Sequence, residues 1–523
     1  MRQWRTFGIP RSGPDGHAGS MDQTRAPYVE AIQQLASSEP LHVMVPGHGG
    51  TPAAGGAHLA DVYGERIAEY DVPLMLDGID LGDHSARVQS QQLAAEAWGA
   101  KRVWWLTNGA SQGNRTAALA VRGLGERVLM QRSSHSSFVD GVLLAGLIPA
   151  FVAPTIDEAH GIAHGLTPER LDEALREEAE HGRKASSVYI VSPSYFGSTA
   201  DVRALAEVAH AHGAALIVDG AWGAHFGFHE GLPESPARLG ADIVISSTHK
   251  LAGSLTQASM LHLAEGPFAE QLEPLIDRAY TMTASTSASA ILMGSLDLAR
   301  RALVQGRDQI GASIRAAEQL RERVRADDRF LVIRDDFSQF ADIVQTDPLR
   351  VPIDVSKIGQ SGHWVRDRLI TEHGVFFEMS TATTIVAVIG ALAAPDVDRV
   401  MRALGAVADE ADALRAEGRA DTLTAFPPLP EAGMLRMLPR AAYFAESVVV
   451  TAHQAIGRIS ADTLAAYPPG IPNLVPGEEI TEQTVTFLQA VAASPTGVVR
   501  GAADPLVATF RVVRDPVTAS LQA

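Results

Sequence analysis

Two apolar stretches, Ala214-Ala-Leu-Ile-Val-Asp219 and Ala241-Asp-Ile-Val-Ile-Ser-Ser-Thr-His-Lys250, decide the fold class of this chain. Each is typical of a buried β-strand, and each ends in an ionisable residue, Asp219 or Lys250. Consecutive parallel strands place their carboxyl ends at one edge of a sheet, where open α/β sheets bind ligands. We therefore expect a carboxylate and an amine at the same ligand-binding edge.

The segment around these strands, from about residue 95 to 265, alternates strand-like and helix-like stretches. The apolar patterns predict strands over residues 102–107, 127–131, 148–152 and 187–191, and helices over residues 111–122, 139–145 and 201–212 and after Thr167. Such alternation indicates an α/β domain with a mostly parallel sheet covered by helices on both faces.

The pattern changes after this domain. A long helix is predicted over residues 291–325, followed by strands at 330–334, 374–378 and 384–389 and a helix at 397–415. These elements favour a smaller α+β domain, and 523 residues exceed what one hydrophobic core usually holds. We expect an N-terminal segment over residues 1–60, a large domain over 61–325 and a C-terminal α+β domain over 326–523.

The composition narrows the class of protein. The formal net charge is −18 with a pI near 5.4, which argues against binding to nucleic acid or to an anionic membrane. There is no cysteine, so disulfides and thiolate metal sites are excluded, and no metal site is predicted. The longest apolar run, residues 141–154, is broken by Pro149 and too short to span a bilayer. Residues 1–20 lack the apolar segment of a secretory signal, so we expect a cytoplasmic protein.

Lys250 and Asp219 together suggest pyridoxal phosphate (PLP) as the cofactor. A lysine in a desolvated pocket gives up its proton more readily and becomes an amine nucleophile suited to Schiff-base chemistry. A carboxylate can pair with the pyridine nitrogen of this cofactor. We therefore predict that Lys250 holds the aldehyde and that Asp219 pairs with the ring nitrogen.

A phosphate site is predicted at Thr107-Asn-Gly-Ala-Ser-Gln-Gly113, a turn between a strand and a helix. Backbone N–H groups at a helix start, together with the Ser111 hydroxyl, favour anions. His135 follows another predicted strand and offers a flat face for a pyridine ring. Taken singly, the turn can be a tight connection and the histidine a capping or core residue. Their order along one sheet edge favours a single cofactor site.

At these residues the chain resembles the bacterial ornithine/lysine/arginine decarboxylases of the aspartate-aminotransferase fold, in their shorter form without a wing domain. The resemblance runs from Thr24 to Glu478. It implies a fold type I large domain with a mostly parallel seven-stranded sheet, and a smaller α+β C-terminal domain. It rests on the motifs Val45-Pro-Gly-His48, Thr107-Asn-Gly-Ala-Ser111, Arg132-Ser-Ser-His135, Asp219-Gly-Ala-Trp222, Ser247-Thr-His-Lys250 and Tyr467-Pro-Pro-Gly-Ile-Pro472.

The resemblance also implies roles for single residues. Lys250, Asp219, His135 and His249 are the implied catalytic residues. Glu378 is expected near the distal amino or guanidinium group of the substrate, and a homodimer with shared active sites is expected. The implied cofactor-binding residues are Ala110, Ser111, Ser247 and His249 at the phosphate, His135 and Ala221 on the two ring faces, Trp222 in the same motif as Ala221, and Thr286 and Ser287 from the partner subunit.

The implied reaction is PLP-dependent decarboxylation of a basic amino acid, namely lysine, arginine or ornithine, to the corresponding amine and carbon dioxide. The same cofactor site can also support transamination, aldol cleavage or elimination, because the outcome depends on which Cα bond lies perpendicular to the ring. A non-catalytic PLP-binding regulator or partner subunit is a further alternative. Which amino acid is the substrate stays open, because five positions depart from the family pattern: Gly49, Ser136, Ala288, Ala290 and Thr381.

Overall fold

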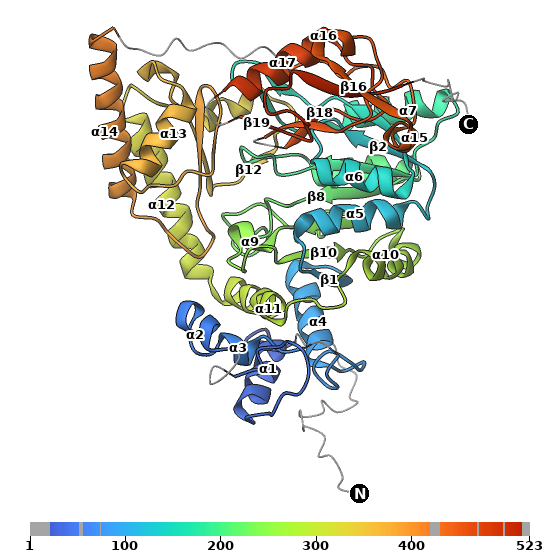
Figure 1. Cartoon of the computed structure of the whole chain (residues 1–523). Coiled ribbons are helices and arrows are strands. Elements are labelled where there is room, and N and C mark those ends of the chain that lie inside the picture. Colours follow the sequence, from blue (N-terminus) through green and yellow to red (C-terminus); the bar gives the residue numbers. More distant parts are fainter. Residues whose placement is uncertain are drawn as a thin grey trace, which may run out of the picture.

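A seven-stranded sheet in the order β1-β10-β9-β8-β6-β2-β3 forms the centre of the computed structural model, which describes residues 21–51, 56–73, 75–418, 429–467, 470–494 and 497–514 (Figure 1). Only β10 runs antiparallel to its neighbours, so the predicted mostly parallel sheet is confirmed. The sequence patterns identified every strand except β10. The strands are β1 (Arg102–Leu106), β2 (Arg127–Gln131), β3 (Ile148–Val152), β6 (Ser187–Val191), β8 (Ala215–Asp219), β9 (Ile243–Ser246) and β10 (Ser259–Leu263).

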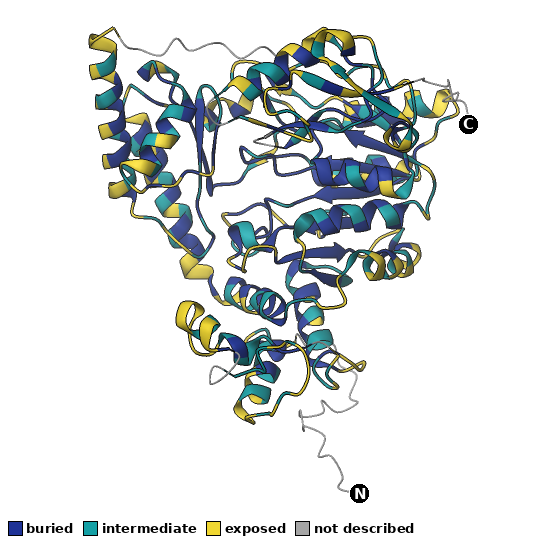
Figure 2. Ribbon diagram, in the orientation of Figure 1, coloured by how far each residue is buried: buried dark blue, intermediate teal, exposed yellow. Residues whose placement is uncertain are grey.

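Helices cover both faces of this sheet, and we call the sheet with these helices the large domain. One face packs against α5 (Gly109–Val121), α6 (Ser136–Ala145) and α10 (Ala269–Thr283). The opposite face packs against α7 (Pro168–Glu180) and α8 (Val202–Ala211). The Thr167 side chain caps α7, because it accepts a hydrogen bond from the Arg170 N–H. The inner strands β6, β8, β9 and β10 are buried throughout, whereas the edge strand β3 is only partly buried (Figure 2).

The helix predicted over residues 291–325 is two helices, α11 (Ala290–Gln305) and α12 (Arg307–Arg325), so that prediction was wrong at Gly306. A Cβ at Gly306 would lie 2.4 Å from Leu392 Cδ2 and 2.5 Å from the Ala302 carbonyl oxygen. Glycine is also a poor helix former, and the break lets the chain turn from α11 toward the next domain. Before β1, the chain forms α1 (Pro27–Ser37), α2 (Ala57–Tyr63), α3 (Ile67–Tyr70) and α4 (Ala86–Trp98).

A second sheet, in the order β11-β13-β15-β14, forms what we call the small domain together with two helices. Its elements are β11 (Leu331–Val332), β13 (Arg350–Asp354), α13 (Gly362–Thr371), β14 (Met379–Ser380), β15 (Thr384–Val388) and α14 (Val397–Ala416). The prediction of a strand over residues 374–378 was wrong, since the strand in this region, β14, contains only Met379 and Ser380. Arg366 instead donates to the Phe377 carbonyl, and the chain at Phe376 is exposed. Of the predicted strand 330–334, only β11 forms, followed by the 3-10 helix η1 (Ile333–Gln339).

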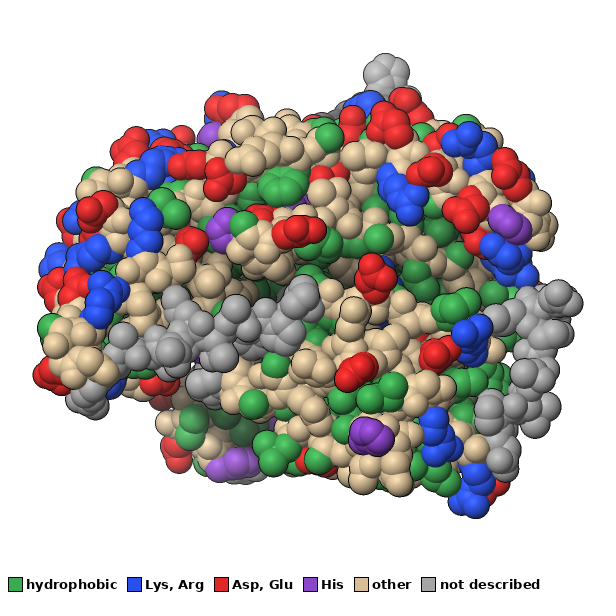
Figure 3. Space-filling view, turned by 90° about the horizontal axis from the view of Figure 1, so that it is seen from above, with side chains coloured by type: hydrophobic (Ala, Val, Ile, Leu, Met, Phe, Trp, Pro, Cys, Tyr) green, Lys and Arg blue, Asp and Glu red, His purple; other side chains and the backbone are tan. Residues whose placement is uncertain are grey.

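Described residues from 429 to 514 form a C-terminal unit with its own hydrophobic core. Two strands, β16 (Ser447–Thr451) and β20 (Thr509–Val513), pair in one sheet, and β17 (Leu464–Tyr467), β18 (Ile471–Leu474) and β19 (Val498–Arg500) form another. Its helices are α15 (Pro439–Phe444), α16 (Ala452–Ala455) and α17 (Glu482–Ala493). Pro468 and Pro469 of the predicted family motif lie outside the described residues. The unit covers the α6 side of the large domain (Figure 1). On the face of the molecule that Figure 3 shows, acidic and basic side chains are mixed.

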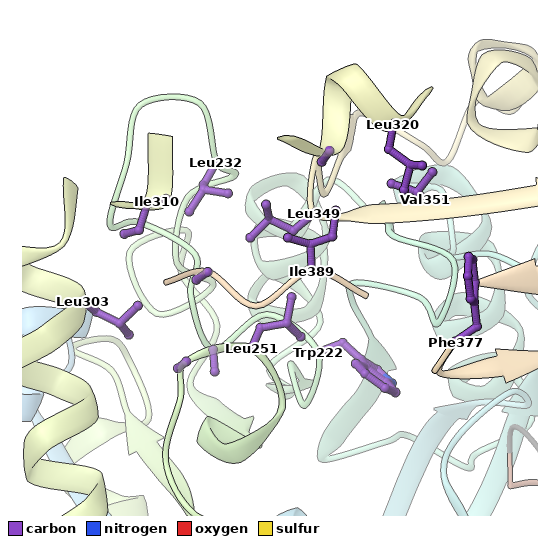
Figure 4. Packing of buried hydrophobic residues seen from close by; sticks show 14 of the residues in the cluster. Trp222, Leu232, Leu251, Leu303, Ile310, Leu320, Leu349, Val351, Phe377 and Ile389 are labelled. Carbon is purple, nitrogen blue, oxygen red and sulfur yellow. The ribbon is translucent and has the colours of Figure 1, made fainter. Parts of the chain in front are cut away.

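The small domain joins the large domain through one continuous apolar cluster. In Figure 4, Leu349 and Ile389 of the small domain lie next to Leu251 and Trp222 of the large domain. The Ala391 N–H also donates to the Leu251 carbonyl oxygen. The shared apolar cluster therefore holds the small domain against Leu251, the residue that follows Lys250 in the sequence. No helix among the described residues is long and apolar enough to cross a membrane.

Close packing of α5 on the sheet yields a test of the fold. A Cβ at Gly113 would lie 2.8 Å from Ile245 Cγ2 and 2.9 Å from Leu106 Cδ1. We expect Gly113→Ala to lower the free energy of unfolding by about 1–3 kcal/mol, the usual cost of overpacking a core. The matched control is Gly405→Ala in α14, where nothing lies within 4 Å of the added Cβ. Thermal unfolding midpoints should fall for Gly113→Ala only; equal midpoints would contradict the packing argument.

Candidate active site

Asp219 and Lys250 lie at one edge of the sheet. Asp219 ends β8, and Lys250 follows β9 in the single-turn helix α9 (Thr248–Leu251). Lys250 is half-buried, and its Nζ lies 3.5 Å from the centre of the Trp222 ring. Burial lowers the pKa of Lys250 to about 8, with Asp219 acting to raise it and Arg350 to lower it. A lysine with this pKa exchanges its proton readily near neutral pH.

The Asp219 carboxylate is buried and held by three hydrogen bonds. Its Oδ2 accepts from the Tyr189 hydroxyl at 2.6 Å and from Asn114 Nδ2 at 3.0 Å. Its Oδ1 accepts from the Ala221 N–H at 3.0 Å. Burial raises the pKa of Tyr189 well above its usual value, so this hydroxyl remains a donor. These three donors hold the carboxylate in a fixed position at the end of β8.

The predicted phosphate turn leads into α5, which begins at Gly109. Gly109 has a φ of 68°, a conformation that glycine adopts without strain, and it turns the chain from β1 into the helix. Asn108 precedes α5 but makes no side-chain cap, so the first N–H groups of the helix have no capping side chain. Ala110 and Ser111 lie in this first turn, which is the arrangement that favours an anion.

His135 caps the next helix, α6. Its Nδ1 accepts a hydrogen bond from the Ser137 N–H at 3.2 Å and lies 2.8 Å from Ser137 Oγ. Asn114 Nδ2 donates to that same Ser137 hydroxyl and to Asp219. Burial lowers the pKa of His135, and the charges of Asp219 and Lys250 also act on it. His135, Asp219 and Lys250 therefore interact electrostatically.

His249 and Ser247 flank the turn of α9. His249 Nδ1 donates to the Ala258 carbonyl oxygen at 3.0 Å, which leaves Nε2 as the acceptor of the neutral ring. Burial lowers the pKa of His249, and the charges of Lys250 and Glu378 act on it. Ser247 is buried beside it. The structure thus brings together the candidate residues of β8, α5, α6 and α9.

Glu378, Thr286 and Ser287 are exposed. Glu378 immediately precedes β14, and its charge acts on Lys250, His249 and Arg350, so it borders the same site. Thr286 and Ser287 lie on the loop between α10 and α11. Ser287 lines a cavity of about 490 Å³ together with Thr107 and Asn108 of the phosphate turn. The roles of all three residues stay predictions.

Arg350 is a site residue that the sequence analysis missed. It begins β13 in the small domain, is 1% exposed, and its guanidinium carbon lies 4.0 Å from the centre of the Trp222 ring. Nη1 donates to the Tyr195 carbonyl oxygen, whereas Nε and Nη2 have no hydrogen-bond partner among the described residues. Burial lowers the pKa of Arg350 to about 10. No local motif marks it, because it reaches the site only through the docking of the small domain.

These residues fit the PLP cofactor predicted from the sequence. An uncapped helix start suits the phosphate, and a carboxylate held by three donors suits a protonated ring nitrogen. A lysine of lowered pKa suits the aldehyde. Each of the three groups lies on a different element of the sheet edge, as one elongated cofactor requires.

Comparisons with known proteins agree with the fold and this geometry. The structure is similar to the lysine decarboxylase LdcF of Francisella novicida, with a TM-score of 0.78 and 19% identity, over 94% of this chain and 81% of that one. It is likewise similar to lysine decarboxylase A of Pseudomonas aeruginosa, with a TM-score of 0.78 and 20% identity, over 93% and 80% of the two chains. The fold is thus the aspartate-aminotransferase-like α/β fold expected from the sequence.

The sequence comparisons identify the family. Residues 26–391 match the major domain of the Orn/Lys/Arg decarboxylases, and residues 424–496 match their C-terminal domain. The chain belongs to the Orn/Lys/Arg decarboxylase family, which confirms the prediction of an amino-acid decarboxylase. It is 31% identical to arginine decarboxylase of Bacillus subtilis (strain 168), over 95% of this chain and 99% of that protein. It is also 31% identical to arginine decarboxylase of Halalkalibacterium halodurans, over 94% and 98% of the two chains.

Two of the departures from the family pattern have a structural explanation. Ser136, one of these positions, accepts a hydrogen bond from Arg500 Nη1 of the C-terminal unit at 3.0 Å. The Arg500 charge acts on His135. Thr381 Oγ1 accepts from the N–H groups of Thr383 and Thr384 and so shapes the turn between β14 and β15. Arg500 therefore places a cation beside Ser136.

Competitive acylation of the cofactor-free protein tests the environment of Lys250. The chain has only four lysines, so each amine is easily followed by mass spectrometry. Lys250 is charged and unreactive below its pKa and neutral above it, so we expect labelling with a midpoint near pH 8. Arg350→Gln should raise this midpoint, because the Arg350 charge opposes protonation of Lys250. Lys184, which is exposed, is the reference amine. A Lys250 midpoint near pH 10, its ordinary range, would contradict the assignment.

Proposed function

We propose that this protein decarboxylates L-arginine to the corresponding amine with PLP held at Lys250. The observation that carries the proposal is the buried Lys250 amine, whose pKa of about 8 reflects burial together with the opposing charges of Asp219 and Arg350. The choice of arginine rests on the relatives described as arginine decarboxylases, which align over nearly their whole length.

The cofactor would be held by the residues that the site brings together. Ala110, Ser111, Ser247 and His249 would bind its phosphate, while His135 and Ala221 would lie on the two faces of its ring. Asp219, held in place by its three hydrogen-bond donors, would pair with the ring nitrogen. When bound, PLP supplies an electron sink for the electron pair that the departing carbon dioxide leaves behind.

The substrate carboxylate would bind at Arg350. Two of its buried nitrogens lack hydrogen-bond partners among the described residues, and a carboxylate satisfies such a guanidinium well. The Trp222 ring, which contacts both Arg350 and Lys250, gives this position an apolar wall. Low polarity favours loss of neutral carbon dioxide from a charged carboxylate. Arg350 would thus orient the carboxylate while Trp222 keeps water away from it.

Proton transfer to Cα would come from Lys250 or His249. A pKa of about 8 lets Lys250 act as an acid and, once discharged, as an amine near neutral pH. Glu378 would pair with the distal guanidinium of arginine, since its charge already acts on this site from the exposed rim. The two ends of the substrate would then bind opposite charges, Arg350 at one end and Glu378 at the other.

A homodimer is part of this proposal. Large apolar side chains are exposed near the site, notably Phe376 at 78%, Met282 at 73% and Leu255 at 49%. A second copy of the chain would cover exposed apolar side chains of this kind. Thr286 and Ser287 are exposed on the α10–α11 loop, where a second copy would receive them. The partner's hydroxyl groups would complete the cofactor site.

An amino-acid panel tests the proposed reaction. We expect the PLP-loaded protein to release equal amounts of carbon dioxide and amine from L-arginine, and less from L-lysine and L-ornithine. Lys250→Ala should reduce turnover by at least about 10³-fold, because the nucleophile and a proton donor are both lost. Carbon dioxide and amine are measured together with the keto acid. Formation of the keto acid without carbon dioxide would favour a transaminase and overturn the proposal.

Tyr189 offers a test of the cofactor itself. Tyr189→Phe removes one of the three donors to Asp219, and we expect PLP to bind about three- to tenfold more weakly, the value of one such hydrogen bond. The dissociation constant is measured by equilibrium dialysis. The matched control is Tyr280→Phe, since Tyr280 donates to the Trp105 carbonyl oxygen rather than to Asp219. Unchanged affinity in Tyr189→Phe would argue against Asp219 as the partner of the ring nitrogen.

A further inference from the structure

His225 and Asp347 form a buried pair across the boundary between the two domains. His225 lies on the loop that follows β8 in the large domain, and Asp347 leads into β13 of the small domain. Both side chains are 0% exposed, and His225 Nε2 lies 3.1 Å from Asp347 Oδ1. That oxygen also accepts from the Leu349 N–H at 2.9 Å. One oxygen of Asp347 is thus held from two sides.

The other oxygen of Asp347 faces Arg350 without bonding to it. Asp347 Oδ2 lies 3.6 Å from Arg350 Nε, which is within ion-pair range but longer than a hydrogen bond. Asp347 Oδ2, Arg350 Nε and Arg350 Nη2 all lack hydrogen-bond partners within the part of the chain that the structure describes. Arg350 therefore has a counterion that balances its charge and leaves donors unused.

A contact that served only to hold the two domains together would not leave these buried groups of Asp347 and Arg350 without hydrogen bonds. Buried polar groups left without partners cost free energy, and a carboxylate rotated by a small angle would bond Arg350 directly. The contacts of Asp347 Oδ1 to His225 and Leu349 oppose that rotation. The unused donors belong to the guanidinium that stacks on Trp222, whose ring also contacts Lys250.

We propose that His225 is a positioning residue for substrate binding: it restrains Asp347 so that Asp347 does not saturate Arg350, and Arg350 keeps its donors for the substrate carboxylate. This inference rests on the proposed function, in which Arg350 binds that carboxylate. It further implies that the affinity for the substrate depends on a hydrogen bond between the domains that touches neither the substrate nor the cofactor.

Comparison of two ligands tests the role of His225. In His225→Leu the freed Asp347 should close on Arg350, and the KM for L-arginine should rise about tenfold, the value of one charge-assisted hydrogen bond. The inhibition constant of agmatine, the amine that has no carboxylate, should change less than about twofold. His225→Gln, which keeps a donor, should restore the KM. His210→Leu is the matched control, because His210 pairs with Asp242 inside the large domain.

A double-mutant cycle shows whether His225 acts through Arg350. In an Arg350→Gln background, His225→Leu should have no further effect on the KM for L-arginine, because the guanidinium that it would disturb is gone. Additive effects of the two substitutions on the KM, or equally weakened binding of arginine and agmatine, would overturn the proposal. This holds even where His225→Leu also lowers the unfolding midpoint. Absence of arginine turnover in the wild type would instead refute the proposed function. The two failures are therefore distinguishable.

Discussion

The site depends on one electrostatic constraint: Lys250 must remain a usable amine although a carboxylate lies near it. Asp219 favours the charged ammonium, whereas burial and Arg350 oppose it, and the balance leaves the Lys250 pKa at about 8. Each of these groups comes from a different part of the fold. Asp219 ends β8, Lys250 follows β9, and Arg350 begins β13 of the small domain. The Lys250 amine therefore has its properties only when both domains are docked.

Sequence reasoning was strongest where the relevant signal is local. The strand ends at Asp219 and Lys250, the turn at Gly109 and the capping position of His135 can each be read within about ten residues, and the structure brings them together. It failed where the signal is distant. Gly306 breaks a helix because Leu392 packs against it, and Arg350 joins the site because the small domain docks through Leu349 and Ile389. Neither contact leaves a periodic pattern in the sequence.

The C-terminal unit supports the loop that carries His135. Arg132 forms a buried ion pair with Glu478 at 3.1 Å, and the Ser136 N–H donates to the Gly470 carbonyl oxygen. Arg500 adds its contact to Ser136. These contacts come from three different parts of the C-terminal unit. The position of His135 therefore depends on the docking of the C-terminal unit as well as on its own helix.

A second histidine, His160, connects the small domain to the large domain. Its protonation determines the pH range over which this contact stabilises the fold. His160 lies on the hairpin of β4 (Ile156–Asp157) and β5 (Ile162–Ala163), with Nδ1 2.9 Å from Asp157 and Nε2 3.4 Å from Asp354 of β13. The hydrogen bond to Asp354 raises the pKa of His160 from 6.5 to about 8. A raised pKa in the folded state means that this contribution is complete below about pH 6.5 and is lost as the pH rises through 8. Asp354 and Arg350 are the two ends of the same short strand. The strand that carries Arg350 is therefore held by His160 at one end and by the His225–Asp347 pair at the other. The position of Arg350 over Trp222 thus depends on contacts between the two domains rather than on any single loop.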